Sequence, residues 1–578
     1  MASTLFAKKT VSDLQAEAES HTLKRALGPF QLISLGIGAI IGAGLFSLTG
    51  LAAATNAGPA VAISMIIASV GCAFAGLCYS EFSCMIPVSG SAYTYTYATM
   101  GEWLAWIMGW SLVLEYAIGA ATVSISWSGY VVSLLHDFGI NLPAQLVSSP
   151  LEALHLADGT TVQGIINLPA VFIVAVISTL LMVGIKESVR TNAVIVVVKV
   201  AVVIVLITVG WFYINRHNYV PFIPPNQGVF GAFGVSGILA GAGTIFFAYI
   251  GFDAVSTAAQ EARNPQKDMP IGIIGSLLIC TVLYVLFSIV LTGMVPYTKL
   301  NVSAPVAVAI DVTGISWLMV LVKLGVICGF TSVILVMLLG QSRVFFTMSR
   351  DGLVPKVFSE VHPSFQTPWK SNMLFGIFVA ILGAFLPLQI VGHMTSIGTL
   401  FAFIIVCAGV WIMRHTHPDV PRPFKVPLVP LVPILGIGWN FVMMYSLGAE
   451  NWTRLIVWTV LGQLIFFFYS RKHSKVQGGN ARLTRADKAL GLANVGFLAG
   501  GVVAFLMRPA TELGVKAGFA DVLNHGAGVA DPAVAAVALT SFYYVLAGVI
   551  VGSIIGALAG YAIGSNTPVE EEAKSLGD

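Results

Sequence analysis

Long apolar runs alternate with short polar segments along most of the chain. A helix that crosses a bilayer needs about 20 apolar residues, because the hydrocarbon core is about 30 Å thick. The pattern predicts twelve such helices, at 30–53, 60–84, 103–133, 165–184, 192–214, 234–259, 271–295, 317–342, 373–392, 395–413, 430–448 and 452–470. Two more are predicted at 488–507 and 540–563, so the expected total is fourteen spans.

Composition argues against a soluble protein. Of the 578 residues, 57% are hydrophobic and only 10% are charged, whereas soluble domains carry about 25% charged residues. The six cysteines have no CxxC spacing, so the sequence suggests neither a metal site nor a disulfide framework. No Walker A, HExxH or nucleophile-elbow sequence is present, which argues against an ATP-driven pump and a membrane enzyme.

Lysine and arginine gather in alternate loops. They crowd the N-terminal segment and the segment from 471 to 488, whereas the loop from about 134 to 164 contains neither. Because cytoplasmic loops carry such an excess, we expect both termini in the cytoplasm and a multi-pass protein of the cell membrane. The polar N-terminus has no short apolar core followed by a small-residue cleavage site, so no cleaved signal peptide is predicted.

These patterns predict one membrane domain with additions at both ends. The predicted parts are a cytoplasmic N-terminal segment (1–28), a twelve-span domain (29–470), a cytoplasmic linker (471–487), two additional spans (488–563) and a cytoplasmic tail (564–578). The expected partners are the lipid bilayer and a small molecule, and no nucleic acid. An oligomer or a small accessory membrane protein is left open.

Two predicted spans share an unusual interruption. Span 1 contains the glycine-rich stretch Gly36–Gly50, and span 6 contains Gly241 and Gly243 followed by Phe246–Asp253. Interrupted helices at matching positions of two halves indicate a transporter built from inverted repeats, with its site between the halves. The alternative is that the glycines only allow close helix packing.

An unwound helix offers specific chemistry inside a bilayer. Its freed backbone groups must find partners, so unwinding is tolerated only beside a ligand or a cavity. Amides at the start of a half-helix attract an anion, and freed carbonyls attract a cation. We therefore expect an amino acid to place its carboxylate at the amides and its ammonium at the carbonyls. The residues assigned to these two roles are Gly42, Ala43 and Gly44 for the carboxylate, and Ile40, Phe247 and Ile250 for the ammonium.

Several motifs resemble one known family. They are GIGAIIGAGLFSLTG (36–50), AGPA (57–60), YSEFSCMIPVSGSAYTYTY (79–97), GIKES (184–188), FFAYIGFDAVSTAAQEARNPQKDMPI (246–271), MSRDGLVP (348–355) and RPFKVP (422–427). In this order they resemble the cationic amino acid transporter branch of the amino acid–polyamine–organocation superfamily, over about 25–470. Two positions depart from the pattern. Ala43 stands where many relatives have Thr, and Gln260 stands where an acidic residue is common.

The resemblance implies a fold and a coupling ion. The implied fold is an all-α membrane protein with a leucine-transporter-like 5+5 inverted repeat, broken helices 1 and 6, spans 11 and 12, and two extra C-terminal spans. Family members place a lysine in span 5 where sodium-coupled relatives bind sodium, and Lys199 occupies that place here. Protonation of Lys199 is therefore expected to replace sodium, with no other cofactor. The alternative is a static charge that ties helices 1, 5 and 8 together.

Three further residues are candidates for the substrate site, and Phe247 has a second predicted role. Glu115 and Asp253 are carboxyl groups inside predicted spans, where a charge is costly unless it is paired or used. By resemblance Phe247 is an aromatic gate and Met337 lines the side-chain pocket, which it would narrow for long or cationic substrates. Each of the carboxyl groups has a structural alternative, namely ordering a helix break. Three tyrosines, at 93, 95 and 97, are predicted to form an interfacial aromatic belt.

The sequence thus predicts a secondary active transporter and no enzyme. We expect L-amino acids, favouring neutral ones of small to medium size, to move by alternating access with proton symport. The alternatives left open are a sodium-independent amino-acid or cationic amino-acid exchanger and a transporter-like nutrient sensor. A channel is disfavoured, because it would need a continuous polar path instead of two broken helices.

Overall fold

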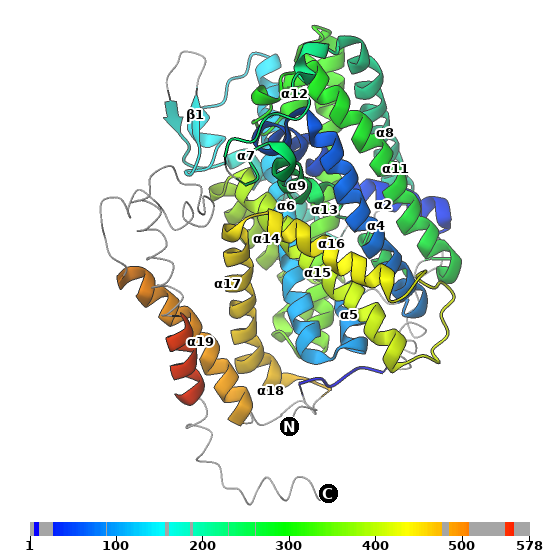
Figure 1. Cartoon of the computed structure of the whole chain (residues 1–578), viewed down its shortest axis with the longest axis vertical. Helices are drawn as coiled ribbons and strands as arrows, with labels where there is room; N and C mark the ends of the chain where they lie inside the picture. Colours follow the sequence, from blue (N-terminus) through cyan, green and yellow to red (C-terminus); the bar gives the residue numbers. More distant parts are fainter. Residues whose placement is uncertain are drawn as a thin grey trace, which may run out of the picture. The chain divides into compact units, whose positions relative to one another are not determined.

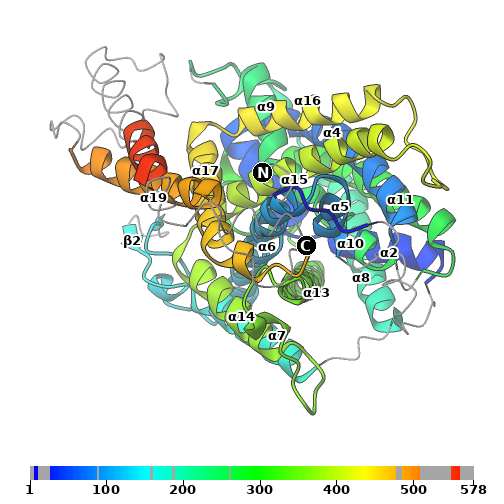
Figure 2. The same cartoon turned by 90° about the horizontal axis from the view of Figure 1, so that it is seen from below.

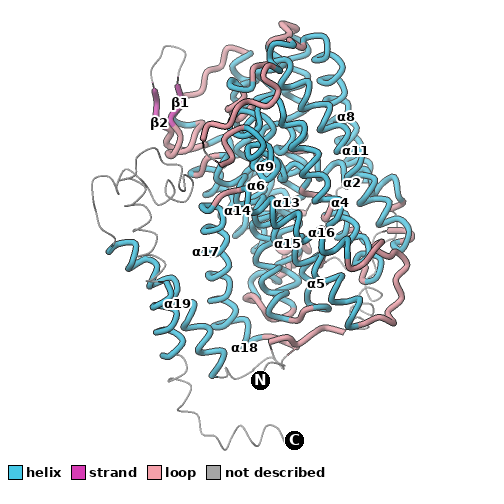
Figure 3. Tube along the Cα trace, in the orientation of Figure 1, coloured by secondary structure: helices cyan, strands magenta, loops and turns pink. Residues whose placement is uncertain are grey.

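The computed structural model describes residues 5–10, 27–87, 90–155, 161–184, 189–228, 230–259, 262–476, 485–507 and 549–559. Gln260, much of the predicted linker at 471–487, part of the predicted span at 540–563 and the tail at 564–578 lie outside these residues. The described residues are mainly helical, with one short hairpin (Figure 3). The chain divides into two compact units, a large one made of Lys8–Thr347 and Val357–Leu447, and a small one made of Met1–Ala7, Met348–Lys356 and Gly448–Asp578.

The large unit contains most of the helices, coloured from blue to yellow in Figure 1. Its α-helices are α2 (Pro29–Ile40), α3 (Thr49–Ala52), α4 (Val61–Met85), α5 (Ser91–Thr99), α6 (Glu102–Asp137), α7 (Leu168–Val183), α8 (Val189–Gly210), α9 (Gly234–Ile245), α10 (Ala254–Thr257), α11 (Pro265–Met294), α12 (Pro305–Asp311), α13 (Ser316–Arg350, which ends in the small unit), α14 (Trp369–Phe385), α15 (Leu388–Thr416) and α16 (Leu431–Ser446). Strands β1 (Ala153–His155) and β2 (Thr161–Gln163) pair antiparallel, with Leu154 opposite Val162.

Short 3-10 and π-helical segments join or extend these helices. The π-helical segments are η1 (Gly44–Leu48), η2 (Ala53–Ala57) and η11 (Phe466–Ser470). The 3-10 segments are η3 (Gly58–Ala60), η4 (Ala144–Leu146), η5 (Trp211–Tyr213), η6 (Arg216–Tyr219), η7 (Phe246–Tyr249), η9 (Tyr297–Lys299) and η10 (Lys356–Ser359). Such departures from regular α-helix often mark functional positions, and η1 and η7 lie where the sequence predicts the two interruptions.

The small unit is built around α17 (Ala449–Ile465), α18 (Arg471–His473) and α19 (Arg485–Met507), to which a helix at Val549–Ala559 is added. Helix α17 packs against α19. The guanidinium of Arg471 pairs with the carboxylate of Asp487 at 3.1 Å, and both side chains are buried. This ion pair therefore fixes the chain on either side of the segment at 477–484.

Eight helical runs among the described residues are long and apolar enough to cross a membrane. They are Gly44–Met85, Glu102–Asp137, Val194–Tyr213, Gly234–Ser256, Pro265–Met294, Ser316–Arg350, Leu388–Thr416 and Glu450–His473. Shorter apolar helices lie at Pro29–Ile40, Leu168–Val183, Trp369–Phe385, Leu431–Ser446 and Val549–Ala559. The protein is therefore a multi-pass membrane protein, and the predicted total of fourteen spans remains a prediction.

Helix α11 organises the neighbourhood of the first interruption. It packs along both α2 and α4, and α2 also packs against α8 (Figure 1). Helix α15 packs along α6 and α16, and Figure 2 shows the same unit with α13 nearly end-on. Because α2 and α9 end inside this assembly, their terminal backbone groups lie among buried side chains.

Two predictions about side chains near the membrane surface need revision. The tyrosines at 93, 95 and 97 are buried, so the predicted interfacial belt is wrong. Tyr95 stacks on Phe82 with ring centroids 5.1 Å apart, which the alternating sequence pattern does not reveal. Lys323 lies near the outer end of an apolar run, which predicts a side chain that snorkels to the interface, but it is buried. Its amino group pairs with Asp137 at 2.7 Å and Asp311 at 3.1 Å.

Candidate functional site

The first helix interruption lies between α2 and η1. Ile41 has an extended backbone (φ −71°, ψ 102°), so the α-helix stops there. The chain coils again from Ala43, and the carbonyl of Gly42 accepts hydrogen bonds from the amides of Leu45 and Phe46 at 3.2 Å each. At the start of a helix the first amides lack partners within the helix. Within the described residues the amides of Gly42, Ala43 and Gly44 have no backbone acceptor.

The second interruption follows α9 and η7. Ile250 is extended (φ −60°, ψ 136°), and Gly251 has φ +120°, a conformation that L side chains rarely adopt. The carbonyl of Phe247 accepts a hydrogen bond from the Ile250 amide at 3.2 Å. A short helix, α10, then resumes after Asp253. Both interruptions predicted from the glycine pattern are therefore present as breaks in the helical backbone.

The two breaks face each other at backbone contact distance. A Cβ placed on Gly44 would lie 2.1 Å from the Ala248 Cα, and one placed on Gly251 would lie 2.7 Å from the Ala39 carbonyl carbon. Each glycine thus abuts the backbone of the other broken helix. A side chain at either position would force the two breaks apart.

Neighbouring helices bind the carbonyls at the end of α2. The Lys199 amino group on α8 donates to the Gly38 oxygen at 2.7 Å, and the Tyr284 hydroxyl on α11 donates to the Ile40 oxygen at 2.9 Å. Lys199 is 1% exposed, and its Cε lies 3.2 Å from the position of a Cβ on Gly329 of α13. The Ile40 oxygen assigned to a substrate ammonium therefore already accepts one hydrogen bond, and a carbonyl oxygen can accept a second.

The two candidate carboxyl groups differ in their surroundings. Asp253 is buried and satisfied, since its Oδ2 accepts from the Tyr116 hydroxyl at 2.6 Å and its Oδ1 from the Gly251 amide at 3.2 Å. These bonds match the structural alternative, in which Asp253 orders the second break. Glu115 is also buried, beside Asp253 and Thr399, yet neither of its carboxyl oxygens has a hydrogen-bond partner within the described residues. An unsatisfied buried carboxyl is costly, so the Glu115 oxygens have capacity for a further hydrogen bond.

Met337 reaches the first break through helix α13. A Cβ on Gly42 would lie 3.3 Å from a Val333 methyl carbon, and Met337 follows one helical turn later on the same face. The Met337 sulfur lies 3.1 Å from the position of a Cβ on Gly119 of α6. Met337 is therefore wedged between α13 and α6, one turn along α6 from Glu115.

The predicted site residues are connected to the two breaks in different ways. Backbone contacts join the two breaks, which contain Ile40, Gly42, Ala43, Gly44, Phe247, Ile250 and Asp253. Glu115 joins them beside Asp253, Met337 joins them through Val333, and Lys199 joins them through the end of α2.

The sequence reasoning missed three tyrosines that bind the broken helices. They are Tyr116, Tyr284 and Tyr130, whose hydroxyl donates to the Phe46 carbonyl at 2.6 Å. These tyrosines could have been found from the sequence, because a tyrosine inside an apolar run is buried and its hydroxyl requires a hydrogen-bond partner.

Two broken helices in contact inside a multi-pass helical membrane protein define a permease. The sequence profile of the amino acid permease family matches residues 27–473, and the chain belongs to that family.

Individual relatives refine the comparison. The chain is 45% identical to a methylthioribose transporter of Bacillus subtilis over 82% of this chain and 99% of the relative. It is also 45% identical to the branched-chain amino acid permease BcaP of the same organism, over 82% of this chain and all of the relative. A vacuolar cationic amino acid transporter 4 of Arabidopsis thaliana is 38% identical over 78% of this chain and 93% of the relative. The resemblance to cationic amino acid transporters is thereby confirmed.

Proposed function

We propose that this permease is a secondary active transporter that moves L-amino acids by alternating access, with proton symport. The observation that carries the proposal is the contact of the two breaks, with Gly44 against Ala248 and Gly251 against Ala39. Irregular backbone inside a bilayer is tolerated where it lines a binding site. A zwitterion supplies both charges that such a site attracts.

In this proposal the substrate bridges the two breaks. Its carboxylate binds the amides of Gly42, Ala43 and Gly44, which have no backbone acceptor within the described residues. Its ammonium binds carbonyls at Ile40, Phe247 and Ile250. Because Ala43 has no hydroxyl, the backbone amides alone would hold the carboxylate. Phe247 would cover the bound molecule, and Glu115 would face its ammonium or side chain.

Lys199 would couple the proton to the substrate. Its hydrogen bond is to Gly38, which lies in the last turn of α2, directly before the first break. A hydrogen bond from an ammonium is stronger than one from a neutral amine, so the proton on Lys199 stabilises one position of the end of α2. Sodium is not required in this scheme. The static-tether alternative predicts that Lys199 matters for stability only.

The proposed substrates are neutral amino acids of small to medium size. A relative at 45% identity is named for branched-chain amino acids, whereas a relative named for cationic amino acids is 38% identical. Met337 occupies the space between α13 and α6 that a long side chain would need. Methylthioribose is the second candidate, because an equally similar relative carries that name.

The finer architecture is part of the same proposal. We infer a 5+5 inverted repeat in which α2 with η1 and α9 with η7 are the matching broken helices. Spans 11 and 12 and two C-terminal spans would complete fourteen, with both termini in the cytoplasm of a cell membrane. In this arrangement the cytoplasmic N-terminal segment ends at 28, the twelve-span domain at 470, the linker at 487 and the two additional spans at 563.

Uptake into proteoliposomes tests the proposal. The purified chain would be offered radiolabelled leucine, alanine, arginine and methylthioribose, each with and without an inward proton gradient. We expect the gradient to drive accumulation of leucine or alanine. Uptake that does not depend on the gradient but requires amino acid inside the vesicle would favour an exchanger. Uptake of methylthioribose alone would show that the substrate is methylthioribose and not an amino acid.

A further inference from the structure

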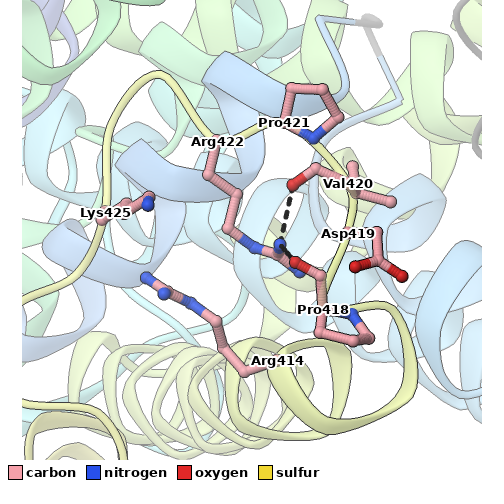
Figure 4. A pocket seen from close by; sticks show the side chains of 7 residues that line it. All are labelled: Arg414, Pro418, Asp419, Val420, Pro421, Arg422 and Lys425. Atoms are coloured by element: carbon pink, nitrogen blue, oxygen red, sulfur yellow. Dashed lines mark hydrogen bonds between the residues drawn. The ribbon is translucent and has the colours of Figure 1, made fainter.

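A polar cavity lies where α15 ends, away from the two breaks. It has a volume of about 420 Å³ and is lined by Arg414, Pro418, Asp419, Val420, Pro421, Arg422 and Lys425 (Figure 4). Its lining carries three cations and one anion. The charge pattern of the sequence assigns this end of α15 to the cytoplasmic side, and nothing in the proposed transport cycle uses the cavity.

The cavity walls are held rigidly by Glu81 of α4. The Arg414 guanidinium donates to both Glu81 oxygens, from Nε at 2.8 Å and from Nη2 at 2.7 Å. The Val426 amide donates to the same carboxylate at 2.7 Å, and the Arg422 Nε lies 3.3 Å from it. One buried carboxylate thus positions two arginines and the far end of the loop.

Arg422 closes the end of helix α15. Its Nη1 donates to the carbonyls of Pro418 at 2.9 Å and Val420 at 2.7 Å, the bonds drawn in Figure 4. Its Nη2 donates to the carbonyls of Met413 and His417. Burial lowers the pKa of the Arg422 guanidinium from its usual value, while Glu81 opposes that shift. Arg422 therefore builds the cavity and supplies charge, but its Nη1 and Nη2 are engaged by backbone carbonyls and its Nε faces Glu81.

Two donors remain available to a bound anion. Lys425 is exposed, and within the described residues its amino group has no hydrogen-bond or ion-pair partner. The Arg414 Nη1 likewise has no partner there, because the pair with Glu81 uses Nε and Nη2. In Figure 4 these two groups point to the same side of the cavity, whereas Asp419 lies opposite. The cavity is thus suited to an oxyanion beside Lys425 and Arg414.

The surroundings favour an anion that belongs to a lipid. Helix α15 has 29 residues and is therefore about 43 Å long, which exceeds a hydrocarbon core of about 30 Å, and the charged Arg414 in its last turn assigns this end to the headgroup region. Trp411 and Ile412 are exposed on its last turns, and Leu428 and Leu431 are exposed just after the loop. A tryptophan at this depth is typical of the membrane interface. Acyl chains can therefore lie along these side chains while a headgroup enters the cavity.

We propose that this cavity binds the phosphate group of an anionic phospholipid, with Lys425 and Arg414 as the contacting cations. Basic pockets on the cytoplasmic side of membrane proteins suit such headgroups, and each nearby lysine strengthens the attraction. A free phosphate ester shares this chemistry, so the experiment separates the two sources.

Thermal unfolding of the full chain in a neutral detergent measures the binding. Phosphatidylglycerol, phosphatidylcholine and glycerol 3-phosphate would be titrated separately, against the wild type and the variants Lys425→Gln and Lys425→Arg. Lys425 is exposed, so these variants keep the fold. Lys356→Gln is the matched control, because it removes another exposed lysine outside the cavity.

We expect phosphatidylglycerol to raise the unfolding temperature at concentrations where phosphatidylcholine does not. Lys425→Gln should increase the concentration required about fivefold, whereas Lys425→Arg and Lys356→Gln should leave it near the wild-type value. An equal response to phosphatidylcholine, or no change in Lys425→Gln, would overturn the proposal. Equal potency of glycerol 3-phosphate would overturn the assignment to a lipid and leave a soluble phosphate ester as the ligand.

Discussion

The Lys199 amino group donates a hydrogen bond of 2.7 Å to the carbonyl oxygen of Gly38. Gly38 is three residues before the extended Ile41, so α8 holds the last turn of α2 next to the first break. Tyr284 holds the Ile40 carbonyl in the same turn. A change in the charge of Lys199 therefore acts on backbone that reaches the proposed substrate site within a few residues.

The contact of the two breaks predicts different outcomes for two buried glycines. Gly44→Ala should abolish transport and lower the unfolding temperature, because its Cβ would lie 2.1 Å from backbone of Ala248. Overpacking of this kind costs about 1–3 kcal/mol or more. Gly76→Ala on α4 is the control, since Gly76 is also buried but its Cβ would make only an ordinary contact, 3.5 Å from an Ile273 methyl carbon. Equal transport by the two variants would show that the breaks do not need their close approach.

The hydrogen bond between Tyr116 and Asp253 predicts a second variant. Tyr116→Phe should lower transport about tenfold, because it removes one of the two bonds that hold the Asp253 carboxylate at the second break. Tyr219→Phe is the control. It also deletes a hydroxyl bond, to the Ile289 carbonyl at 2.7 Å, but this bond joins η6 to α11 and involves no residue of either break. The measurement is the initial uptake rate per mole of folded protein for Tyr116→Phe and Tyr219→Phe. Equal rates would mean that transport does not require the hydrogen bond from Tyr116 to Asp253.

Met337 predicts the range of substrates. Met337→Ser should allow arginine to compete with leucine, because shortening this side chain opens the space between α13 and Gly119 of α6. Met319→Ser makes the same substitution elsewhere on α13 and should keep the wild-type profile. Competition of leucine uptake by unlabelled arginine is the measurement. If arginine competes equally with the wild type and Met337→Ser, Met337 does not set the size limit.

Much of the fold was predictable because a bilayer allows few solutions. Long apolar runs must be helices when no water satisfies the backbone, so the helices follow the hydropathy pattern closely. The glycine clusters located both breaks, since Gly44 and Gly251 occupy places where a Cβ would strike backbone. The motif resemblance predicted the family, and the match of the amino acid permease profile to residues 27–473 confirms it.

The partners of buried polar groups were not predictable. Periodicity cannot tell that Tyr95 stacks on Phe82 or that Lys323 pairs with Asp137, because these contacts join segments far apart in sequence. The expected interfacial belt failed for this reason. The hydroxyls of Tyr116 and Tyr284 bind the broken helices, and only the folded arrangement brings them there.

The variant Lys199→Ala separates proton coupling from substrate binding. Proteoliposome accumulation of leucine under an inward proton gradient would be compared for the wild type, Lys199→Ala and Lys323→Ala. Lys323→Ala is the control, because Lys323 is also a buried lysine but pairs with Asp137 and makes no bond to α2. Substrate-induced thermal stabilisation of each variant reports binding separately.

We expect Lys199→Ala to lose gradient-driven accumulation while leucine still stabilises it against unfolding. Lys323→Ala should accumulate as much leucine per mole of folded protein as the wild type. If accumulation by Lys199→Ala still rises with the proton gradient, Lys199 does not couple the proton to the substrate.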